Sequence, residues 1–212
     1  MGKRCLLGTA TGLLIAVCLF SSYHVIVGPN FEAALDNTIH IYAEAGWQGS
    51  GFWLAPNIIV TAKHVVENAG FLKITDREGN EAWSDEVYMD EDMDCAIIVV
   101  RMANHSYLKA ANSDKVKRLD ECYILGHPFG EFRWSITKGI ISNIDVDFSD
   151  DFFGTDLMLQ ADAASYPGNS GGPVLNANGR VIGILVGGII GSDNMSFITP
   201  INHALELMKE IK

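Results

Sequence analysis

The sequence is poor in basic residues and in charged residues overall. Only 15 of its 212 residues are Lys or Arg, against 26 Asp and Glu, so the formal net charge is -11 at pH 7. A nucleic-acid-binding surface needs clustered Lys and Arg that neutralise phosphates, so this balance argues against nucleic-acid partners. Charged residues make up 19% of the chain and hydrophobic residues 48%, which predicts a sizeable buried core.

Cysteine is also scarce, with four residues in the chain and no Cys-x-x-Cys pair. This spacing argues against a zinc site, and we expect neither a metal ion nor another cofactor. Cys5 and Cys18 lie in an apolar N-terminal run, whereas Cys95 and Cys122 lie in strand-like segments. We interpret the latter two as small core residues. A disulfide between them is the alternative if the domain lies outside the cytoplasm.

The N-terminal segment differs from the rest of the chain. Lys3 and Arg4 precede the run from Leu6 to Val27, which contains no Asp, Glu, Lys or Arg. As a helix this run would be about 33 Å long, which is enough to cross a hydrocarbon core of about 30 Å. Residues 1–30 are therefore predicted to be a signal anchor that leaves the following domain outside the cytoplasm. A cleaved signal peptide, which would make the protein secreted, is the alternative.

Beyond Pro29 the sequence alternates between short apolar segments and turn residues. Residues 38–46 alternate as a strand does, and residues 49–66 read as two strands around a Pro-Asn turn, followed by one helical turn. Gly79-Asn80 reads as a hairpin turn, and residues 102–121 as a polar link between two halves. Many short strands at regular spacing predict an all-β sandwich or barrels. The chain closes with "INHALELMKEIK", whose apolar residues recur at helical spacing, so residues 201–212 are predicted to form an amphipathic helix.

One stretch combines a serine with residues that favour unusual backbone conformations, the segment "YPGNSGGPVLNANG" from Tyr166 to Gly179. A glycine-rich turn before a strand is one interpretation, and a nucleophile at Ser170 is the other. A serine hydroxyl needs a neighbouring base, and His64 stands where the apolar strand "NIIVTA" ends. Asp94 directly precedes another apolar strand, where a buried carboxylate is costly unless it accepts hydrogen bonds. His127, in "GHPFG", is interpreted as a turn residue.

Three segments in this order resemble the catalytic blocks of trypsin-like (chymotrypsin-fold) serine proteases. They are "GSGFWLAPNIIVTAKHVV", "DCAIIVV" and "YPGNSGGPVLNANGRVIGI". The segments "YILGHPFG" and "LQADAASYPGNSGGP" are similar to two branches of that family, the Htr/Deg proteases and the glutamyl endopeptidases. The resemblance covers residues 31–212.

The resemblance implies a fold and a set of roles. The fold is all-β, with two six-stranded antiparallel barrels at about 34–105 and 119–199, a C-terminal helix at 201–212 and the N-terminal membrane helix before them. Ser170 would be the nucleophile, His64 the general base and Asp94 the residue that orients it. The oxyanion hole would comprise Gly168, Asn169 and Ser170, through the amides of Gly168 and Ser170 on either side of Asn169.

The resemblance also implies where a peptide substrate would bind. The candidate substrate-binding residues precede the serine or lie on the following strand: Ala164, Ser165, Tyr166, Leu185, Gly187 and Gly188. None of these side chains is charged, so we expect an apolar or small residue before the scissile bond. Glutamyl endopeptidases carry a histidine where this sequence has Leu185, so specificity for glutamate is not supported.

Two departures limit what the resemblance implies. Trypsin-style activation pairs a new N-terminal amine with an aspartate that precedes the serine, but Asn169 stands here and carries no charge. We therefore expect no activation of that type. Htr/Deg proteases usually carry PDZ domains after the protease domain, whereas this sequence ends at Lys212 without one. We expect a monomer or a trimer.

The sequence thus predicts a serine endopeptidase that acts on proteins or peptides outside the cytoplasm. One alternative is a catalytically silent homologue that binds peptides or a partner protein. Hydrolysis of small esters is another, since the same residues permit it.

Overall fold

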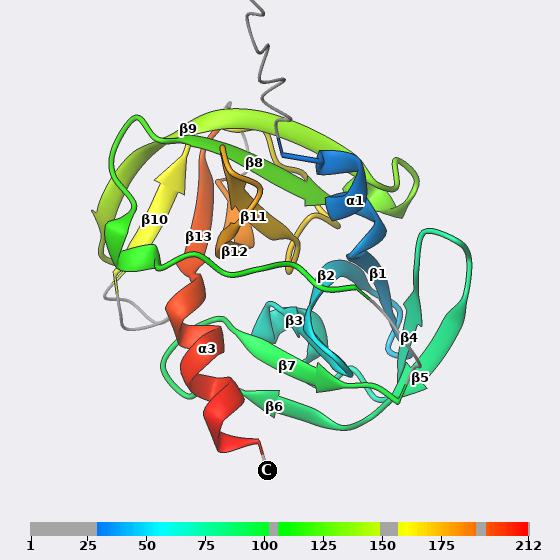
Figure 1. The fold of residues 1–212 in the computed structure, drawn as a ribbon. Coiled ribbons are helices and arrows are strands. Elements are labelled where there is room, and N and C mark those ends of the chain that lie inside the picture. Colours follow the sequence, from blue (N-terminus) through cyan, green and yellow to red (C-terminus); the bar gives the residue numbers. More distant parts are fainter. Residues whose placement is uncertain (1–28, 102–105, 149–156, 190–193, 212) are drawn as a thin grey trace, which may run out of the picture.

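Two β units and a C-terminal helix make up the structure (Figure 1). The computed structural model describes residues 29–101, 106–148, 157–189 and 194–211. The expected membrane segment, residues 1–30, lies outside the described residues except for its last two positions. Within the described ranges, no helix has the length and apolar character that crossing a membrane requires.

The first unit is an antiparallel sheet with the strand order β5-β4-β1-β2-β3-β7-β6. Its strands are β1 (Thr38–Ala43), β2 (Gln48–Ala55), β3 (Ile58–Thr61), β4 (Leu72–Thr75), β5 (Glu81–Ser84), β6 (Val87–Met89) and β7 (Ala96–Val99). The hairpin expected at Gly79-Asn80 is present, because β4 pairs with β5 and the Asp76 carboxylate accepts the Asn80 amide at 2.8 Å.

The expectation of a closed six-stranded barrel is wrong for this first unit, which has seven strands and stays open. The edge strands β5 and β6 follow each other in the chain, yet in the described part of the chain each pairs only with its inner neighbour, β4 or β7. The link between them is irregular: Ser84 Oγ donates to the Val99 carbonyl at 2.7 Å and accepts the Glu86 amide at 3.1 Å. These side-chain hydrogen bonds hold the edge where a β5–β6 ladder would otherwise close the sheet into a barrel.

The second unit is a closed six-stranded barrel, as expected, with the order β10-β13-β12-β11-β8-β9. Its strands are β8 (Glu121–Gly126), β9 (Ser135–Val146), β10 (Met158–Ala161), β11 (Pro173–Asn176), β12 (Val181–Gly188) and β13 (Ser196–Pro200). The Asn178-Gly179 turn joins β11 to β12, and Gly179 has a φ of 70° there. Two short 3₁₀ turns lie at Ser113–Lys115, before β8, and at Pro128–Gly130, between β8 and β9.

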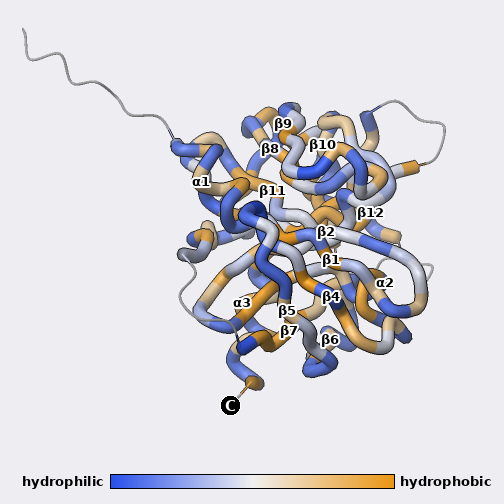
Figure 2. The backbone as a smooth tube through the Cα atoms, turned by 90° about the vertical axis from the view of Figure 1, so that its right-hand side faces the viewer, coloured by the Kyte–Doolittle hydropathy of each residue, from blue (hydrophilic) through white to orange (hydrophobic). Residues whose placement is uncertain are grey.

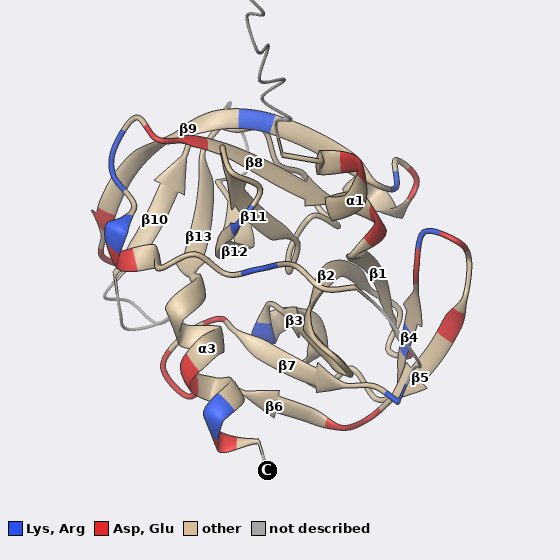
Figure 3. Ribbon diagram, viewed as in Figure 1, with Lys and Arg blue, Asp and Glu red and all other residues tan. Residues whose placement is uncertain are grey.

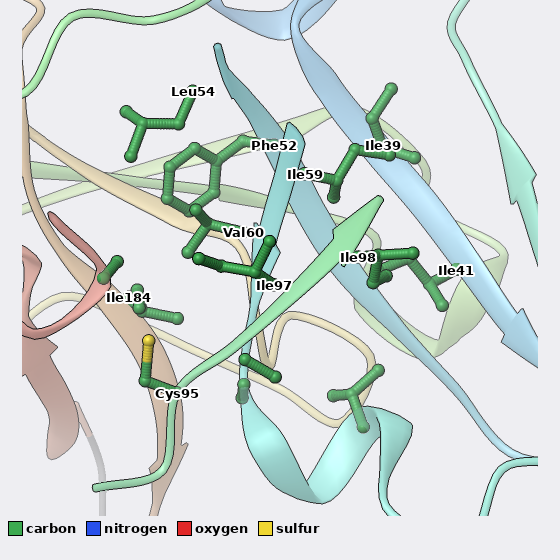
Figure 4. Packing of buried hydrophobic residues seen from close by; sticks show 14 of the residues in the cluster. Ile39, Ile41, Phe52, Leu54, Ile59, Val60, Cys95, Ile97, Ile98 and Ile184 are labelled. Atoms are coloured by element: carbon green, nitrogen blue, oxygen red, sulfur yellow. The ribbon is translucent and has the colours of Figure 1, made fainter. Parts of the chain in front are cut away.

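The apolar core continues from the first unit into the contact between the two units. Figure 4 shows Phe52, Ile59 and Ile97 packed within the first sheet, with Ile184 of β12 on one side of the same cluster. A second cluster, which includes Ile124 and Leu185, fills the barrel. Hydrophobic stretches lie along the strands of both units in Figure 2, whereas the charged residues in Figure 3 lie mainly on loops, strand ends and helices.

Within the described residues, three α-helices complete the fold. α3 (Ile201–Glu210) was expected, and it carries Ile201, Ala204 and Leu207 buried into the core of the first unit, so it ties the barrel's last strand to the other unit. α2 (Lys63–Val66) is one short turn after β3. α1 (Phe31–Asp36) was not expected; Asn30 caps it by accepting the Ala33 amide at 3.2 Å.

Candidate active site

Strand pairing in the first sheet brings His64 and Asp94 together. β3 and β7 are antiparallel, with Thr61 opposite Ala96, so the residues just after β3 and just before β7 lie at the same end of the sheet. The chain turns into α2 after β3, and His64 stands in that turn. Asp94 lies 7% exposed beside it, whereas the His64 side chain is 46% exposed.

Both carboxylate oxygens of Asp94 accept hydrogen bonds from His64. Asp94 Oδ2 lies 2.6 Å from His64 Nδ1, and Asp94 Oδ1 accepts the His64 backbone amide at 3.0 Å. An ionised carboxylate can only accept, so Nδ1 carries a proton in this pair. In the neutral ring this leaves Nε2 as an acceptor, which is the form that a general base requires.

The segment around Ser170, residues 166–172, meets the first sheet beside this pair and is called the serine segment below. The Ser50 amide of β2 donates to the Ser170 carbonyl at 2.7 Å. Gly49 lies so close that a Cβ atom there would be 2.7 Å from the methyl carbons of Val65, the residue after His64, and 3.0 Å from the Ser170 carbonyl oxygen. The serine segment therefore packs directly against the chain that carries His64. The Ser170 hydroxyl itself donates to the Val186 carbonyl of β12 at 3.2 Å.

The backbone of this segment adopts conformations that favour glycine. Gly168 has a φ of 98° and Gly171 a φ of 85°. A side chain at Gly168 would also collide with the His127 carbonyl oxygen. Within the described residues the amides of Gly168 and Ser170 donate no hydrogen bond, whereas the Asn169 amide donates to the Tyr166 carbonyl at 3.0 Å. Two N–H groups that flank one engaged N–H thus stay available beside Ser170.

The comparison with known families agrees with this arrangement. Residues 49–184, more than half of the chain, match the family described as a trypsin-like peptidase domain. The chain belongs to the trypsin-like peptidases. Two curated relatives are named probable periplasmic serine endoprotease DegP-like. The protein from Chlamydia pneumoniae is 36% identical over 163 residues, which cover 72% of this chain and 32% of the relative. The protein from Pseudomonas putida (strain W619) is 34% identical over 176 residues, which cover 80% and 36%.

Solved structures favour the same branch of the trypsin-like peptidases. The HtrA-type protease AlgW with a tripeptide superposes with a TM-score of 0.77 at 27% identity, covering 86% of this chain and 64% of that one. Of the two branches that the sequence left open, the Htr/Deg type is therefore supported. The chain spans about a third of the length of the curated relatives it matches.

The predicted substrate-binding residues of this trypsin-like peptidase fall into two groups. Ser165 and Gly188 lie together, because a Cβ atom at Gly188 would be 3.3 Å from Ser165 Oγ. Ser165 Oγ also lies 2.7 Å from Ser196 Oγ of β13, a contact that only the barrel pairing reveals. The Ser196 proton goes to the Ala163 carbonyl at 2.7 Å, so Ser165 donates in this pair. The exposed Tyr166 ring packs on Phe129, with ring centroids 5.7 Å apart.

The remaining predicted residues contribute through backbone or core. The Ala164 carbonyl accepts Thr137 Oγ1 at 2.7 Å. Gly187 pairs with Phe197 in the β12–β13 ladder. Leu185 turns its side chain into the barrel core, and its amide and carbonyl bond to Gly172 and Gly171 of the serine segment. Leu185 therefore holds the serine segment through its backbone.

The thiols and the buried histidine of the peptidase domain are not reactive groups. Cys95 and Cys122 are free and buried, and burial raises the pKa of both, that of Cys122 to about 12. A thiol with such a pKa carries almost no thiolate near neutral pH, so neither is a nucleophile. His127 lies in the turn that begins the 3₁₀ segment, as expected, but fully buried. Burial, followed by the charges of His40 and Arg133, lowers the pKa of His127 to about 3.

Proposed function

We propose that this chain is a serine endopeptidase in which Ser170, His64 and Asp94 form the catalytic triad. The observation that carries the proposal is the His64–Asp94 pair, in which one carboxylate fixes both the ring and the backbone of the histidine within the first sheet. The serine segment that packs against this chain supplies the hydroxyl. Family membership supports the same roles.

In the proposed reaction Ser170 Oγ attacks the carbonyl carbon of the scissile peptide bond. The hydroxyl first leaves the Val186 carbonyl by rotation about one staggered side-chain torsion. His64 Nε2 takes the hydroxyl proton and later delivers it to the leaving amine, while Asp94 stabilises the protonated ring. A water molecule then attacks the carbonyl carbon of the acyl-enzyme, again with His64 as the base, and the Ser170 hydroxyl is regenerated.

We assign the oxyanion hole to the amides of Gly168 and Ser170. Both are free of hydrogen bonds within the described residues and belong to the segment that holds the nucleophile. Asn169 lies between them with its amide engaged to Tyr166, so its role is to hold the backbone that presents the two donors. Donors of this kind contribute most where negative charge develops in the transition state.

The proposed substrate is an extended segment of protein that lies along β12. The pairing of β12 with β11 ends at Ile184, so among the described residues the edge from Val186 onwards has no neighbouring strand on that side. Gly187 and Gly188 have no side chains that would obstruct a substrate backbone added there. The uncharged hydroxyls of Ser165 and Ser196, hydrogen-bonded to each other, favour a small or apolar residue before the scissile bond.

We place the peptidase domain outside the cytoplasm. Two relatives carry the word periplasmic in their names, and the apolar run from Leu6 to Val27 follows two basic residues, as in a signal anchor. Anchoring through that run, as opposed to its cleavage and secretion, stays a prediction, as does the choice between monomer and trimer. Proteolytic mapping of the N-terminus in membrane and soluble fractions tests the anchor.

The function is tested with the full-length protein, casein and a serine-directed organophosphonate. We expect casein cleavage and covalent labelling at Ser170, and loss of both in Ser170→Ala. Ser84→Ala is the matched control, because it removes a hydroxyl from a buried serine at the edge of the first sheet. A folded wild-type protein that neither cleaves nor becomes labelled, but binds casein, would instead support a silent peptide-binding homologue.

A further inference from the structure

Behind the serine segment, one buried hydroxyl joins three parts of the chain. Ser50 Oγ, in β2 of the first sheet, lies 2.7 Å from the Gly168 carbonyl oxygen. The same oxygen atom lies 3.0 Å from His127 Nδ1 and 3.1 Å from the His127 amide nitrogen. Ser50 and His127 are both fully buried. The first sheet, the β8–β9 turn and the serine segment therefore meet at a single oxygen atom.

Counting protons fixes the direction of each of these bonds. A serine hydroxyl has one proton to donate and two lone pairs that accept. The Gly168 carbonyl can only accept, so it takes the Ser50 proton. The His127 amide can only donate, so it occupies one lone pair, and the remaining lone pair requires a proton on His127 Nδ1. All three bonds are satisfied only when the neutral ring carries its proton on Nδ1.

The surroundings of the other ring nitrogen agree with this tautomer. His127 Nε2 has no hydrogen-bond partner among the described residues. The rings of His40 and Trp134 pack around His127, with centroids 5.2 Å and 5.1 Å away. No contact of Nε2 among the described residues requires a proton there, whereas the bond to Ser50 requires one on Nδ1. Nδ1 is therefore the protonated nitrogen.

The same turn holds the peptide on the other side of Gly168. The Phe129 amide donates to the Pro167 carbonyl at 2.7 Å. In a planar trans peptide the C=O and the following N–H point in opposite directions. The Gly168 N–H is therefore directed away from the His127–Phe129 turn. Ser50 binds the Gly168 carbonyl, and the Gly168 Cα packs against the His127 carbonyl. The Gly168 N–H is therefore the one backbone group of this residue that these contacts leave available.

We propose that Ser50 and His127 are positioning residues of this peptidase: the His127 Nδ1–H orients the Ser50 hydroxyl, which holds the Gly168 carbonyl and so aims the Gly168 amide at the oxyanion. The proposal rests on the proposed function, because it assigns the support of the oxyanion donor used there. Neither side chain touches the substrate, so their effect is transmitted through the backbone of Gly168.

The kinetic test uses four variants of the full-length protein. Ser50→Ala removes the hydroxyl, and His127→Leu removes the Nδ1–H while filling the space. His127→Asn keeps an N–H donor close to the position of Nδ1. Ser84→Ala is the control, since Ser84 Oγ also donates to a carbonyl at 2.7 Å and accepts an amide at 3.1 Å, but within the first sheet.

We expect kcat for a peptide substrate to fall about 10- to 100-fold in Ser50→Ala and His127→Leu, somewhat less than the loss of a whole oxyanion donor. KM should stay within about threefold of wild type, because the donor acts in the transition state. His127→Asn should keep kcat within about threefold of wild type, and Ser84→Ala should leave it unchanged. Equal kcat values in Ser50→Ala and Ser84→Ala, or in His127→Leu and His127→Asn, would overturn the proposal.

A measurement on the wild-type protein keeps the proposal testable if a variant does not fold. Nitrogen NMR of histidine-labelled protein near pH 7 reports which ring nitrogen of His127 carries the proton. The proposal requires the proton on Nδ1. A proton on Nε2 would contradict the proposal even if the kinetic results agreed with it. Wild-type protein without Ser170-dependent hydrolysis would count against the proposed function alone, because the NMR result still decides how Ser50 and Gly168 are bonded.

Discussion

Replacing Asp94 by asparagine separates the chemical role of this carboxylate from its structural role. In the structure Asp94 Oδ1 accepts the His64 amide at 3.0 Å and Oδ2 faces His64 Nδ1 at 2.6 Å. An asparagine amide can keep the first bond through its oxygen. Its NH₂ group then faces Nδ1 and can only donate, so the ring must move its proton to Nε2. Nε2 could then no longer accept the Ser170 proton.

Asp94→Asn should affect the stability of the fold much less than it affects catalysis. Both hydrogen bonds survive in altered form, so the free energy of unfolding should fall by only about 1 kcal/mol, the difference between a charged and a neutral hydrogen bond. The wrong tautomer should lower kcat by about 10⁴-fold, or about 5.4 kcal/mol of transition-state stabilisation. The catalytic loss should therefore far exceed the structural one.

The assay combines steady-state hydrolysis of a chromogenic peptide with reversible denaturant unfolding. Asp76→Asn is the matched control: Asp76 is also buried, and both of its oxygens accept from Asn80 at 2.8 Å, but in the β4–β5 turn. It should lose a similar amount of stability and keep kcat within about twofold of wild type. If Asp94→Asn retained more than a tenth of the wild-type kcat, the assignment of Asp94 as the orienting residue would be wrong.

Three further predictions concern other parts of the chain. Gly188→Ala would place a Cβ atom 2.6 Å from the Met195 carbonyl and beside Ser165, so steady-state kinetics should show KM raised more than kcat is lowered. Burial lowers the pKa of His127 to about 3, so the unfolded chain takes up this proton first as the pH falls below its ordinary value. Denaturant unfolding should therefore show wild type losing up to about 1.4 kcal/mol per pH unit towards pH 3 relative to His127→Asn, and parallel pH profiles would contradict this. Leu207→Ala should destabilise the fold by about 2–5 kcal/mol in the same assay, and the partly buried Leu205 offers a milder control.

Much of the fold could be read from local patterns. The continuous apolar run at "NIIVTA", the turn residues at Gly79-Asn80 and the helical spacing of "INHALELMKEIK" each reflect a preference that acts within one element. α3 follows from such a preference and is present, whereas the closed second barrel, also present, is what the resemblance to trypsin-like proteases implied. The open edge of the first sheet could not be read in this way. It depends on whether β5 and β6 pair with each other, and their side chains carry no signal for that.

The candidate site can likewise be separated into features that the sequence determines and features that need the tertiary structure. The sequence by itself determined the candidates, because a serine among glycines, a histidine after one apolar strand and a carboxylate before another are local facts about Ser170, His64 and Asp94. Only the tertiary structure decided what surrounds them. Ser50 and His127 are 77 positions apart, and Ser50 and Gly168 are 118 apart. No local pattern can report a hydrogen bond across such separations, because it exists only once the first sheet has docked on the barrel.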